Sequence, residues 1–320
     1  MKLQILVPQY KETDEVIKPL LDSIAIQKGV NFDDIGVIIV NDGSEVGLTK
    51  SFLDSYPFKI EYITNIHKGV SAARNHCLAL ATADYVMFCD ADDCFYHVYA
   101  LQIILETINV YGFDVLVNAF YEEVVTPDGQ HSLLKHDNDT IFVHGKVYNR
   151  EFLVINDIYW DTNLLIHEDS YFNCLAGALA QKKRYCPEPY YLWCWNPKSI
   201  SRQDPKYVIK TYSHLIKSAD ALSTALLNRG YDLDSAKMFA INLFQTFYIM
   251  TGIYSEDPNL VEVIDKLKPL AKQFYNKFEH LLQYINPNEL QQIRSNTRQA
   301  AIEHQWYKET ITFPDWIKSL

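Results

Sequence analysis

Long apolar runs are missing from this chain of 320 residues, and so is any pattern that marks a secreted protein. No window approaches eighteen uninterrupted apolar residues, the length that a membrane-spanning helix needs. Residues 1–8 form a short apolar run without a signal-peptide cleavage pattern, which indicates a first strand. We therefore expect no transmembrane segment and a cytoplasmic location, with peripheral contact at the inner face of the membrane left open.

The chain also lacks basic patches and paired cysteines. Its formal net charge of −11 repels phosphate backbones, so nucleic acid is not an expected partner. The six cysteines are scattered, with no C-x-x-C pair and no histidines at zinc-finger spacing. Reduced and mostly buried thiols are the expectation, which agrees with a cytoplasmic location.

Several nucleotide-binding and hydrolytic patterns are absent as well. The first strand leads into Val7-Pro8-Gln9-Tyr10-Lys11 and not into the G-x-G-x-x-G turn of dinucleotide-binding folds. There is no phosphate-loop pattern, no H-E-x-x-H and no nucleophile elbow. Phosphate-loop ATPases are thus excluded, and a hydrolase has no anchor in this sequence.

What is present is a globular composition, 48% hydrophobic, with a regular alternation of strand and helix patterns. Extended runs are expected at 2–7, 35–40, 60–63, 85–89 and 115–120. Helices are expected at 16–24, behind Thr13 as N-cap, and at 71–81 and 98–110. This alternation predicts a parallel sheet covered by helices. A turn at 126–129 between two extended segments then predicts an antiparallel excursion and hence a mixed sheet.

The second half of the chain changes character. Residues 171–180 indicate a helix, and 184–195 indicate an extended run whose two prolines suit an edge strand. After residue 205 helical periods take over, at 206–228, 233–254, 258–278 and 287–305. We expect a domain at 1–204 and a C-terminal helical domain at 205–320. Aromatic residues at 239–248 could form a homo-oligomer or acceptor surface, although their helical spacing more often marks a core.

Three carboxylates follow one apolar strand: Asp90, Asp92 and Asp93. Acids two positions apart can turn toward one site where a strand bends at its carboxyl end, which is where α/β folds bind ligands. Their oxygens suit Mg²⁺ or Mn²⁺, ions that usually bridge to substrate phosphates. The alternative is that Asp92 or Asp93 caps the next helix.

Two further polar side chains stand out. Asp42 ends the second strand within Val40-Asn41-Asp42-Gly43-Ser44, where an ordinary Asp-Gly turn is the alternative. Arg74 lies in Gly69-Val70-Ser71-Ala72-Ala73-Arg74-Asn75, whose small residues let a helix pack closely on the sheet. An arginine on a helix is usually solvated, but here alanines flank it on a helix of buried character. We expect Arg74 to be available for an anion.

Taken in order, these elements closely resemble family 2 glycosyltransferases, which have the GT-A fold. The resemblance covers roughly residues 1 to 205 and implies an α/β fold with a Rossmann-like, mixed and mostly parallel sheet flanked by helices. By the same resemblance, Pro8, Tyr10 and Asp42 hold the nucleoside, which is usually uridine. Arg74 contacts the base or the diphosphate.

The resemblance also implies a metal site and a catalytic base. Asp90 and Asp92, with Ala91 between them, hold the ribose, the sugar and the metal, Mn²⁺ or Mg²⁺. Residues 165–172 match the family's later E-D segment, so Asp169 is the expected base, with capping of the helix at 171–180 as the alternative. His167 is a candidate acceptor contact or third metal ligand, although a structural role is more common.

The segment 190–202 resembles the family's closing segment. An arginine is frequent in that family where this chain has Cys194 or Trp195, so Lys198 or Arg202 would supply the phosphate contact instead. Trp193 and Trp195 either stack on a sugar face or pack in the core.

The sequence thus predicts an inverting, metal-dependent transferase that moves a sugar from a UDP-sugar to an acceptor hydroxyl. The metal neutralises the departing diphosphate, and a carboxylate takes the proton of the attacking hydroxyl. The expected acceptor is a cell-envelope, capsular or exopolysaccharide glycan. Two alternatives stay open: a transferase of the same fold that glycosylates a modified nucleic-acid base, and a non-catalytic scaffold that binds nucleotide sugars.

Overall fold

The computed structural model describes residues 1–126, 128–197, 199, 207–231 and 258–282, and single positions at 288, 295, 315 and 319. The chain divides into two compact units, Met1–Lys198 and Ser199–Leu320. The roles expected for domains at 1–204 and 205–320 stay predictions, because compactness alone assigns no role. Within the described residues, no helix combines the length and the apolar character that a membrane crossing requires.

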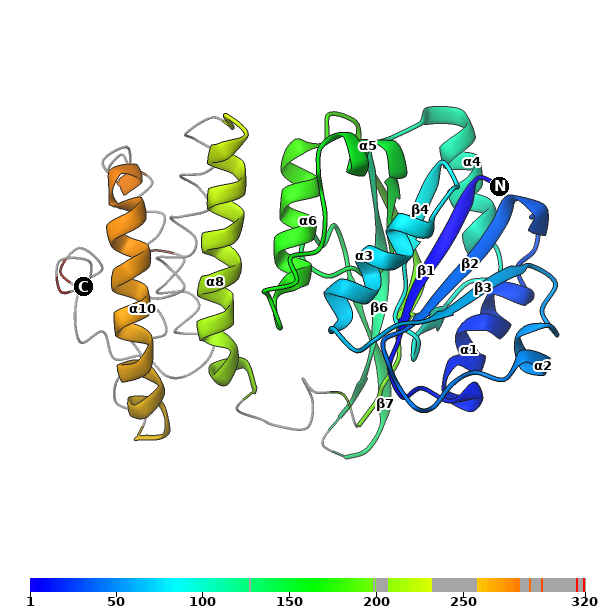
Figure 1. Cartoon of the computed structure of the whole chain (residues 1–320), viewed down its shortest axis with the longest axis horizontal. Helices are drawn as coiled ribbons and strands as arrows, with labels where there is room; N and C mark the ends of the chain where they lie inside the picture. The colour runs from blue at the N-terminus through cyan, green and yellow to red at the C-terminus, as the bar shows by residue number, and fades with distance from the viewer. Residues whose placement is uncertain are drawn as a thin grey trace. The chain divides into compact units, whose positions relative to one another are not determined.

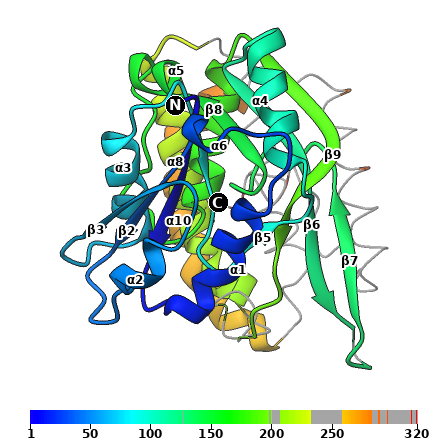
Figure 2. The same ribbon diagram turned by 90° about the vertical axis from the view of Figure 1, so that its right-hand side faces the viewer.

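The first unit is built on a nine-stranded sheet (Figure 2). Its strands are β1 (Leu3–Gln9), β2 (Ile35–Asn41), β3 (Lys59–Thr64), β4 (Tyr85–Phe88), β5 (Cys94–Phe95), β6 (Val115–Val125), β7 (His131–His136), β8 (Lys146–Asn149) and β9 (Lys183–Trp193). Their order is β3-β2-β1-β4-β8-β6-β9-β5, with β7 paired to β6. Strands β3, β2, β1 and β4 run parallel, and β8 joins β4 antiparallel. The predicted mixed sheet is confirmed.

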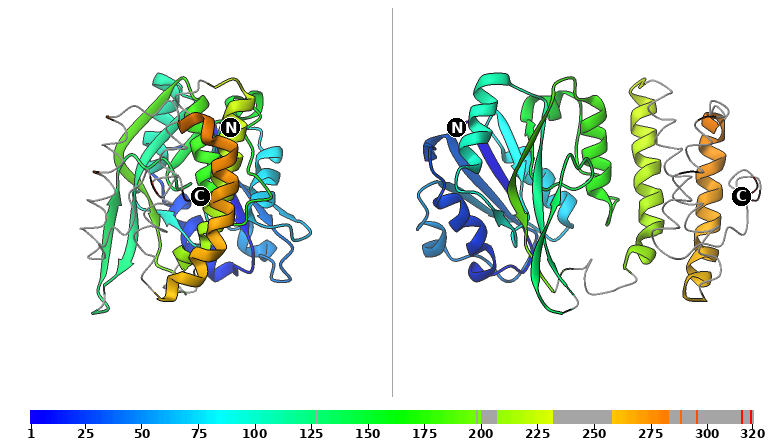
Figure 3. Two further views of the ribbon diagram at one scale, coloured as in Figure 1. Left: turned by 90° about the vertical axis from the view of Figure 1, so that its left-hand side faces the viewer. Right: turned by 180° about the vertical axis from the view of Figure 1, so that it is seen from behind.

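Helices cover both faces of this sheet (Figures 1 and 3). They are α1 (Asp14–Ala25), α2 (Lys50–Leu53), α3 (Val70–Leu80), α4 (Ala100–Tyr111), α5 (Arg150–Ile155) and α6 (Glu168–Leu179), with a short 3₁₀ turn at Phe32–Asp34. The core that holds Leu3, Ile5 and Val7 of β1 also contains apolar residues of α1 and α4. On the opposite face, the ring of Phe88 in β4 meets the ring of Phe172 in α6 at 5.6 Å. The expected sheet flanked by helices is confirmed.

Burial on both faces explains why the first strands appear in the sequence as continuous apolar runs. Leu3, Ile5, Leu6 and Val7 are all 0% exposed, as is usual for parallel strands covered by helices on both sides. Because the carboxyl ends of β1, β2 and β4 lie at the same edge of the sheet, the polar residues that follow these strands come together there.

Strand β9 lies between β6 and β5, but β5 pairs only with Tyr191 and Leu192, near the end of β9. Its register against β6 shifts between Asn118 and Phe120, opposite the stretch that contains Pro187 and Pro189. An irregularity in the ladder accommodates the prolines, and among the described strands only β6 runs beside them, so the edge prediction holds for this stretch but not for the end of β9.

Helix α4 begins later than its apolar spacing suggests, at Ala100 with Tyr99 as its N-cap. Strand β5 separates this helix from Asp92 and Asp93, so the capping alternative for these two acids is wrong. After β6, the amide of Gly129 donates to the carbonyl of Thr126 at 2.8 Å. That turn leads into β7 and produces the antiparallel excursion that the sequence predicts.

In the second unit, the described residues form α8 (Tyr207–Asn228) and α10 (Pro258–Leu282). Leu222 and Leu226 of α8 and Phe274 of α10 are buried, and Lys277 of α10 donates to the hydroxyl of Thr224 in α8 at 2.8 Å. Figure 3 shows the two helices side by side. The helices predicted at 233–254 and 287–305, and with them the aromatic stretch at 239–248, lie outside the described residues, so the homo-oligomer surface stays a prediction.

Candidate active site

A buried arginine gathers acids from two distant parts of the chain. Arg74, on α3, is 3% exposed. Its Nη2 donates to Asp90 Oδ1 at 2.9 Å, and its Nη1 donates to Glu168 Oε1 at 3.1 Å and to Asp169 Oδ1 at 3.0 Å. Its guanidinium also lies 4.4 Å from the ring centre of Trp160. The structure therefore brings together three predicted site residues, Arg74, Asp90 and Asp169.

The charges in this network shift several pKa values. Burial acts to lower the pKa of Arg74, but the carboxylates of Asp169, Asp90 and Glu168 outweigh burial and raise it. Burial likewise acts to raise the pKa of Asp90, and the charge of Arg74 outweighs that effect and lowers it. Arg74 and Asp90 are thus held ionised as a pair.

Asp169 lies in the first turn of α6, directly after His167 and Glu168. Its Oδ1 accepts from Arg74, and its Oδ2 accepts from the amide of Val143 at 3.2 Å. Burial raises its pKa to about 7, against the opposing charge of Arg74. The position of Asp169 in a first turn agrees with the capping alternative, but its carboxylate contacts Arg74 and Val143, outside α6. A carboxyl of this pKa can exchange a proton near neutral pH.

The two acids of the D-x-D pattern differ in their surroundings. Asp90 is tied to Arg74 through its side chain and to the hydroxyl of Tyr191 through its amide, at 3.2 Å. Asp92 accepts from the side-chain amide of Asn196 at 2.8 Å, which joins the D-x-D loop to the segment after β9. Ala91, between them, is 4% exposed. Two carboxylates from one loop therefore reach the same edge of the sheet.

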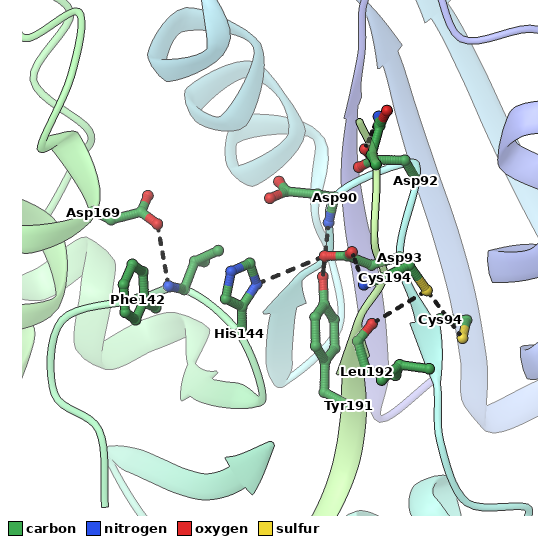
Figure 4. Close-up of polar contacts among 12 residues, drawn as sticks. Asp90, Asp92, Asp93, Cys94, Phe142, His144, Asp169, Tyr191, Leu192 and Cys194 are labelled. Atoms are coloured by element: carbon green, nitrogen blue, oxygen red, sulfur yellow. Dashed lines mark hydrogen bonds and ion pairs between the residues drawn. The ribbon is translucent and has the colours of Figure 1, made fainter. Parts of the chain in front are cut away.

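Asp93, His144 and Tyr191 form a buried cluster that the sequence patterns do not reveal (Figure 4). Asp93 is 1% exposed and accepts from the hydroxyl of Tyr191 and from the amide of Cys194. His144 Nδ1 lies 3.7 Å from Asp93 Oδ2. Burial raises the pKa of Asp93 well above its usual range and lowers the pKa of His144 to about 4. The sequence shows Asp93 as a third carboxylate after the strand, but no sequence motif connects it with His144.

Of the nucleoside residues expected from the sequence, Asp42 lines a cavity of about 950 Å³, which Lys68 and His76 also line. Asp42 is 3% exposed, and its two oxygens accept from the amides of Lys68 and Gly69, each at 2.8 Å. Its carboxylate also lies 2.8 Å from Nδ1 of His67. The Asp-Gly turn alternative is thus incomplete, because Asp42 fixes the backbone that leads into α3.

Tyr10 and Pro8 lie at the same end of the sheet. The ring of Tyr10 stacks on the ring of His67 with centres 4.5 Å apart, and Pro8 pairs with Val40 within the β1–β2 ladder. Glu12, which no pattern singled out, follows them. Burial raises its pKa, and the charges of Asp92 and Asp90 act in the same direction, so Glu12 belongs to the same acidic site.

Other predicted residues lie elsewhere. Lys198 and Arg202 lie outside the described residues, so their phosphate contact stays a prediction. Trp193 packs against the ring of His144 at 4.9 Å, which agrees with the core role. Among the described residues, the side chains close enough to share a metal ion are those of Asp90, Asp93 and His144, and neither Asp92 nor His167 belongs to this group. All the cysteines are free thiols, with the sulfurs of Cys94 and Cys194 3.6 Å apart (Figure 4).

Solved glycosyltransferases share this fold. The chain resembles the crystal structure of S. aureus TarS in complex with UDP-GlcNAc, with a TM-score of 0.66 and 18% identity over 91% of this chain and 83% of that one. It also resembles the mannosyltransferase PcManGT from Pyrobaculum calidifontis in complex with GDP-Man and Mn²⁺, with a TM-score of 0.56 and 16% identity over 96% of this chain and 88% of that one. These similarities establish the GT-A fold.

Sequence comparison leads to the same family. The uncharacterized glycosyltransferase YibD of Escherichia coli (strain K12) is 33% identical over 264 residues, which cover 72% of each chain. The uncharacterized glycosyltransferase EpsJ of Bacillus subtilis (strain 168) is 27% identical over 221 residues, which span 62% of each chain and so less than two thirds of EpsJ. The family model "Glycosyl transferase family 2" matches residues 4–170, and the chain belongs to that family.

Proposed function

We propose that this chain transfers a sugar from a UDP-sugar to an acceptor hydroxyl and inverts the anomeric carbon. The observation that carries the proposal is the Arg74 network, which fixes Asp90 of the D-x-D pair and Asp169, the expected base, on one guanidinium. A donor held by Asp90 would therefore lie beside Asp169. Positioning of this kind supplies much of the rate enhancement of a two-substrate reaction.

The donor's nucleoside fits the cavity beside Asp42. Uracil offers an imide N–H, and Oδ1 of Asp42 keeps a lone pair after accepting the amide of Lys68, whereas Oδ2 accepts the amide of Gly69 and also lies 2.8 Å from Nδ1 of His67. The exposed ring of Tyr10 stacks on His67, whose Nδ1 lies 2.8 Å from Asp42, so an aromatic side chain lies near this position. The complex of TarS with UDP-GlcNAc supports a uridine donor.

We expect Asp90 and Asp92 to hold a divalent cation, because both supply hard carboxylate oxygens from one loop of an acidic site. Burial raises the pKa values of Asp93 and Glu12, and the charges of Asp90 and Asp92 act in the same direction, so both carboxyls lie within the negative field of this site. When bound, Mn²⁺ or Mg²⁺ would neutralise the charge that develops on the departing diphosphate. The complex of PcManGT with GDP-Man and Mn²⁺ supports the choice of metal.

Asp169 takes the proton of the attacking hydroxyl. Arg74 and the amide of Val143 orient its two oxygens, and its pKa of about 7 suits a base that works near neutral pH. A single displacement assisted by this base leaves the anomeric centre inverted.

For the acceptor we propose a cell-envelope, capsular or exopolysaccharide glycan. The net charge of −11 disfavours the alternative acceptor, a modified base within a nucleic acid. The named relatives are bacterial glycosyltransferases, which supports an acceptor found in bacteria.

The test is a panel of UDP-, GDP- and CMP-sugars with and without Mn²⁺, followed by nucleotide release and by NMR of the anomeric product. We expect one UDP-sugar to be turned over only with metal. Asp92→Ala should lose metal-dependent binding, Asp169→Asn should bind donor without turnover, and Asp54→Asn, a surface control paired with Lys50, should match the native chain. Absence of binding by every nucleotide sugar contradicts the proposal, and binding without turnover by the native chain points to the scaffold alternative.

A further inference from the structure

A buried histidine nitrogen, Nδ1 of His144, faces the carboxylate of Asp93, the residue that follows the D-x-D pair. His144 is 4% exposed, and its Nδ1 has no hydrogen-bond partner. The distance of 3.7 Å from Nδ1 to Asp93 Oδ2 is too long for a hydrogen bond. A buried polar nitrogen without a partner is costly, and Figure 4 shows this one turned toward Asp93.

The spacing of these atoms suits a shared ion. One ligand atom from each of Asp90, Asp93 and His144 lies within 4.8 Å of the others. Two atoms that each bind one transition-metal ion at about 2.1 Å, at angles of 90–120°, are roughly 3.0–3.6 Å apart. The His144–Asp93 distance of 3.7 Å is close to this range, and all three ligand atoms, which lie within 4.8 Å of one another, would draw closer around an ion.

Neighbouring groups already orient the ligands. Tyr191 and Cys194 each donate one hydrogen bond to Asp93, which leaves lone pairs on both carboxylate oxygens. The ring of His144 stacks on Trp193 at 4.9 Å and on Tyr191 at 5.2 Å. Hydrogen bonds to a ligating carboxylate and a fixed imidazole ring are typical of metal sites.

The local charge also favours a cation. Arg74 forms ion pairs with Asp90, Glu168 and Asp169, so one positive charge faces three carboxylates, and Asp93 belongs to the same cluster as Asp90. We propose that Asp90, Asp93 and His144 bind a divalent transition-metal ion, without the need for Asp92 or for a nucleotide. An imidazole ligand favours Mn²⁺ over Mg²⁺, which prefers oxygen.

The test uses Mn²⁺ alone with the full chain and no nucleotide. Electron spin echo envelope modulation detects a nitrogen bonded to Mn²⁺. We expect such a coupling in the native chain, its loss in His144→Gln, and a fall in Mn²⁺ affinity of at least about tenfold. The matched control is His136→Gln. The imidazole of His136 belongs to the same aromatic cluster but pairs with Glu122, so this variant should keep the native nitrogen coupling and the native Mn²⁺ affinity.

A labelled native chain makes the test independent of variant folding. With ¹⁵N-histidine, the modulation should change to the ¹⁵N pattern. Bound Mn²⁺ without nitrogen coupling, coupling that survives His144→Gln, or no Mn²⁺ binding without nucleotide would each overturn the inference. Sugar transfer measured in parallel separates the two proposals: turnover without nitrogen coupling leaves the proposed function intact, and coupling without turnover leaves only the metal site.

Discussion

Replacing Arg74 by methionine removes the positive charge that Asp90, Glu168 and Asp169 share, and it keeps an apolar stem against Trp160. Breaking a buried ion pair by removing one partner costs about 3–5 kcal/mol. For a unit of this size, 1 kcal/mol corresponds to roughly 2–4 °C, so we expect the Tm to fall by about 6–20 °C near pH 8.

The sign of the pH dependence gives a sharper test. Without Arg74, the acids are buried without a counter-charge, so their pKa values rise and acidification neutralises them. The loss of stability should therefore be largest at pH 8 and shrink toward pH 5. Differential scanning calorimetry across this range measures it.

Arg184→Met is the matched control, because Arg184 also lies over a ring, 5.0 Å from the centre of Tyr111, but on the surface. Its Tm should change by less than about 2 °C. A loss below about 3 °C for Arg74→Met, or a loss that grows on acidification, would refute the reasoning.

Three further predictions concern catalysis, the nucleoside and the backbone. Asp169→Asn should lower kcat by about 10²–10⁴-fold, and native kcat/KM, from steady-state rates, should fall below a pKa of about 7 because the base must be deprotonated. Asp42→Asn should weaken UDP binding, measured by calorimetry, by roughly tenfold or more, since it removes a charged acceptor; unchanged affinity would contradict the nucleoside assignment. Gly43→Ala should lower the Tm by at least about 3 °C more than Gly129→Ala. Both glycines have a positive φ, but a Cβ on Gly43 would lie 2.3 Å from the amide nitrogen of His67. Equal losses of Tm in the two variants would argue against that clash.

The parallel half of the fold could be predicted from the sequence because β1, β2 and β4 are buried on both faces. Leu3 to Val7 and Ile35 to Val40 are mostly apolar runs, and their burial requires helices above and below. The placement of β9 could not be predicted in this way. Its prolines are excluded from a regular ladder, but only the pairing with β6 shows that a register shift accommodates them.

The candidate site divides along the same line. Asp90 follows the end of a parallel strand, and Arg74 lies in the first turns of a helix. Binding residues in α/β folds gather at such positions, so the sequence could locate both. The contacts of Asp93 with Tyr191 and His144 join segments that only the folded sheet brings together. The sequence did not single out Glu12 for a different reason. Its pKa is raised by burial and by the charges of Asp92 and Asp90, and the sequence around Glu12 shows neither its burial nor these distant acids.

The Arg74 network is better explained by positioning than by stability. Replacing a buried ion pair with apolar residues of similar volume is often neutral or stabilising, so a guanidinium held against three carboxylates is a poor way to stabilise a core. It is, however, an effective way to fix Asp90 and Asp169 relative to each other, since both bond to one planar group. Both terminal nitrogens are already engaged, so a contact of Arg74 with a diphosphate would have to use its remaining N–H groups. A role in holding the donor-side acid and the base in register accounts for this geometry directly.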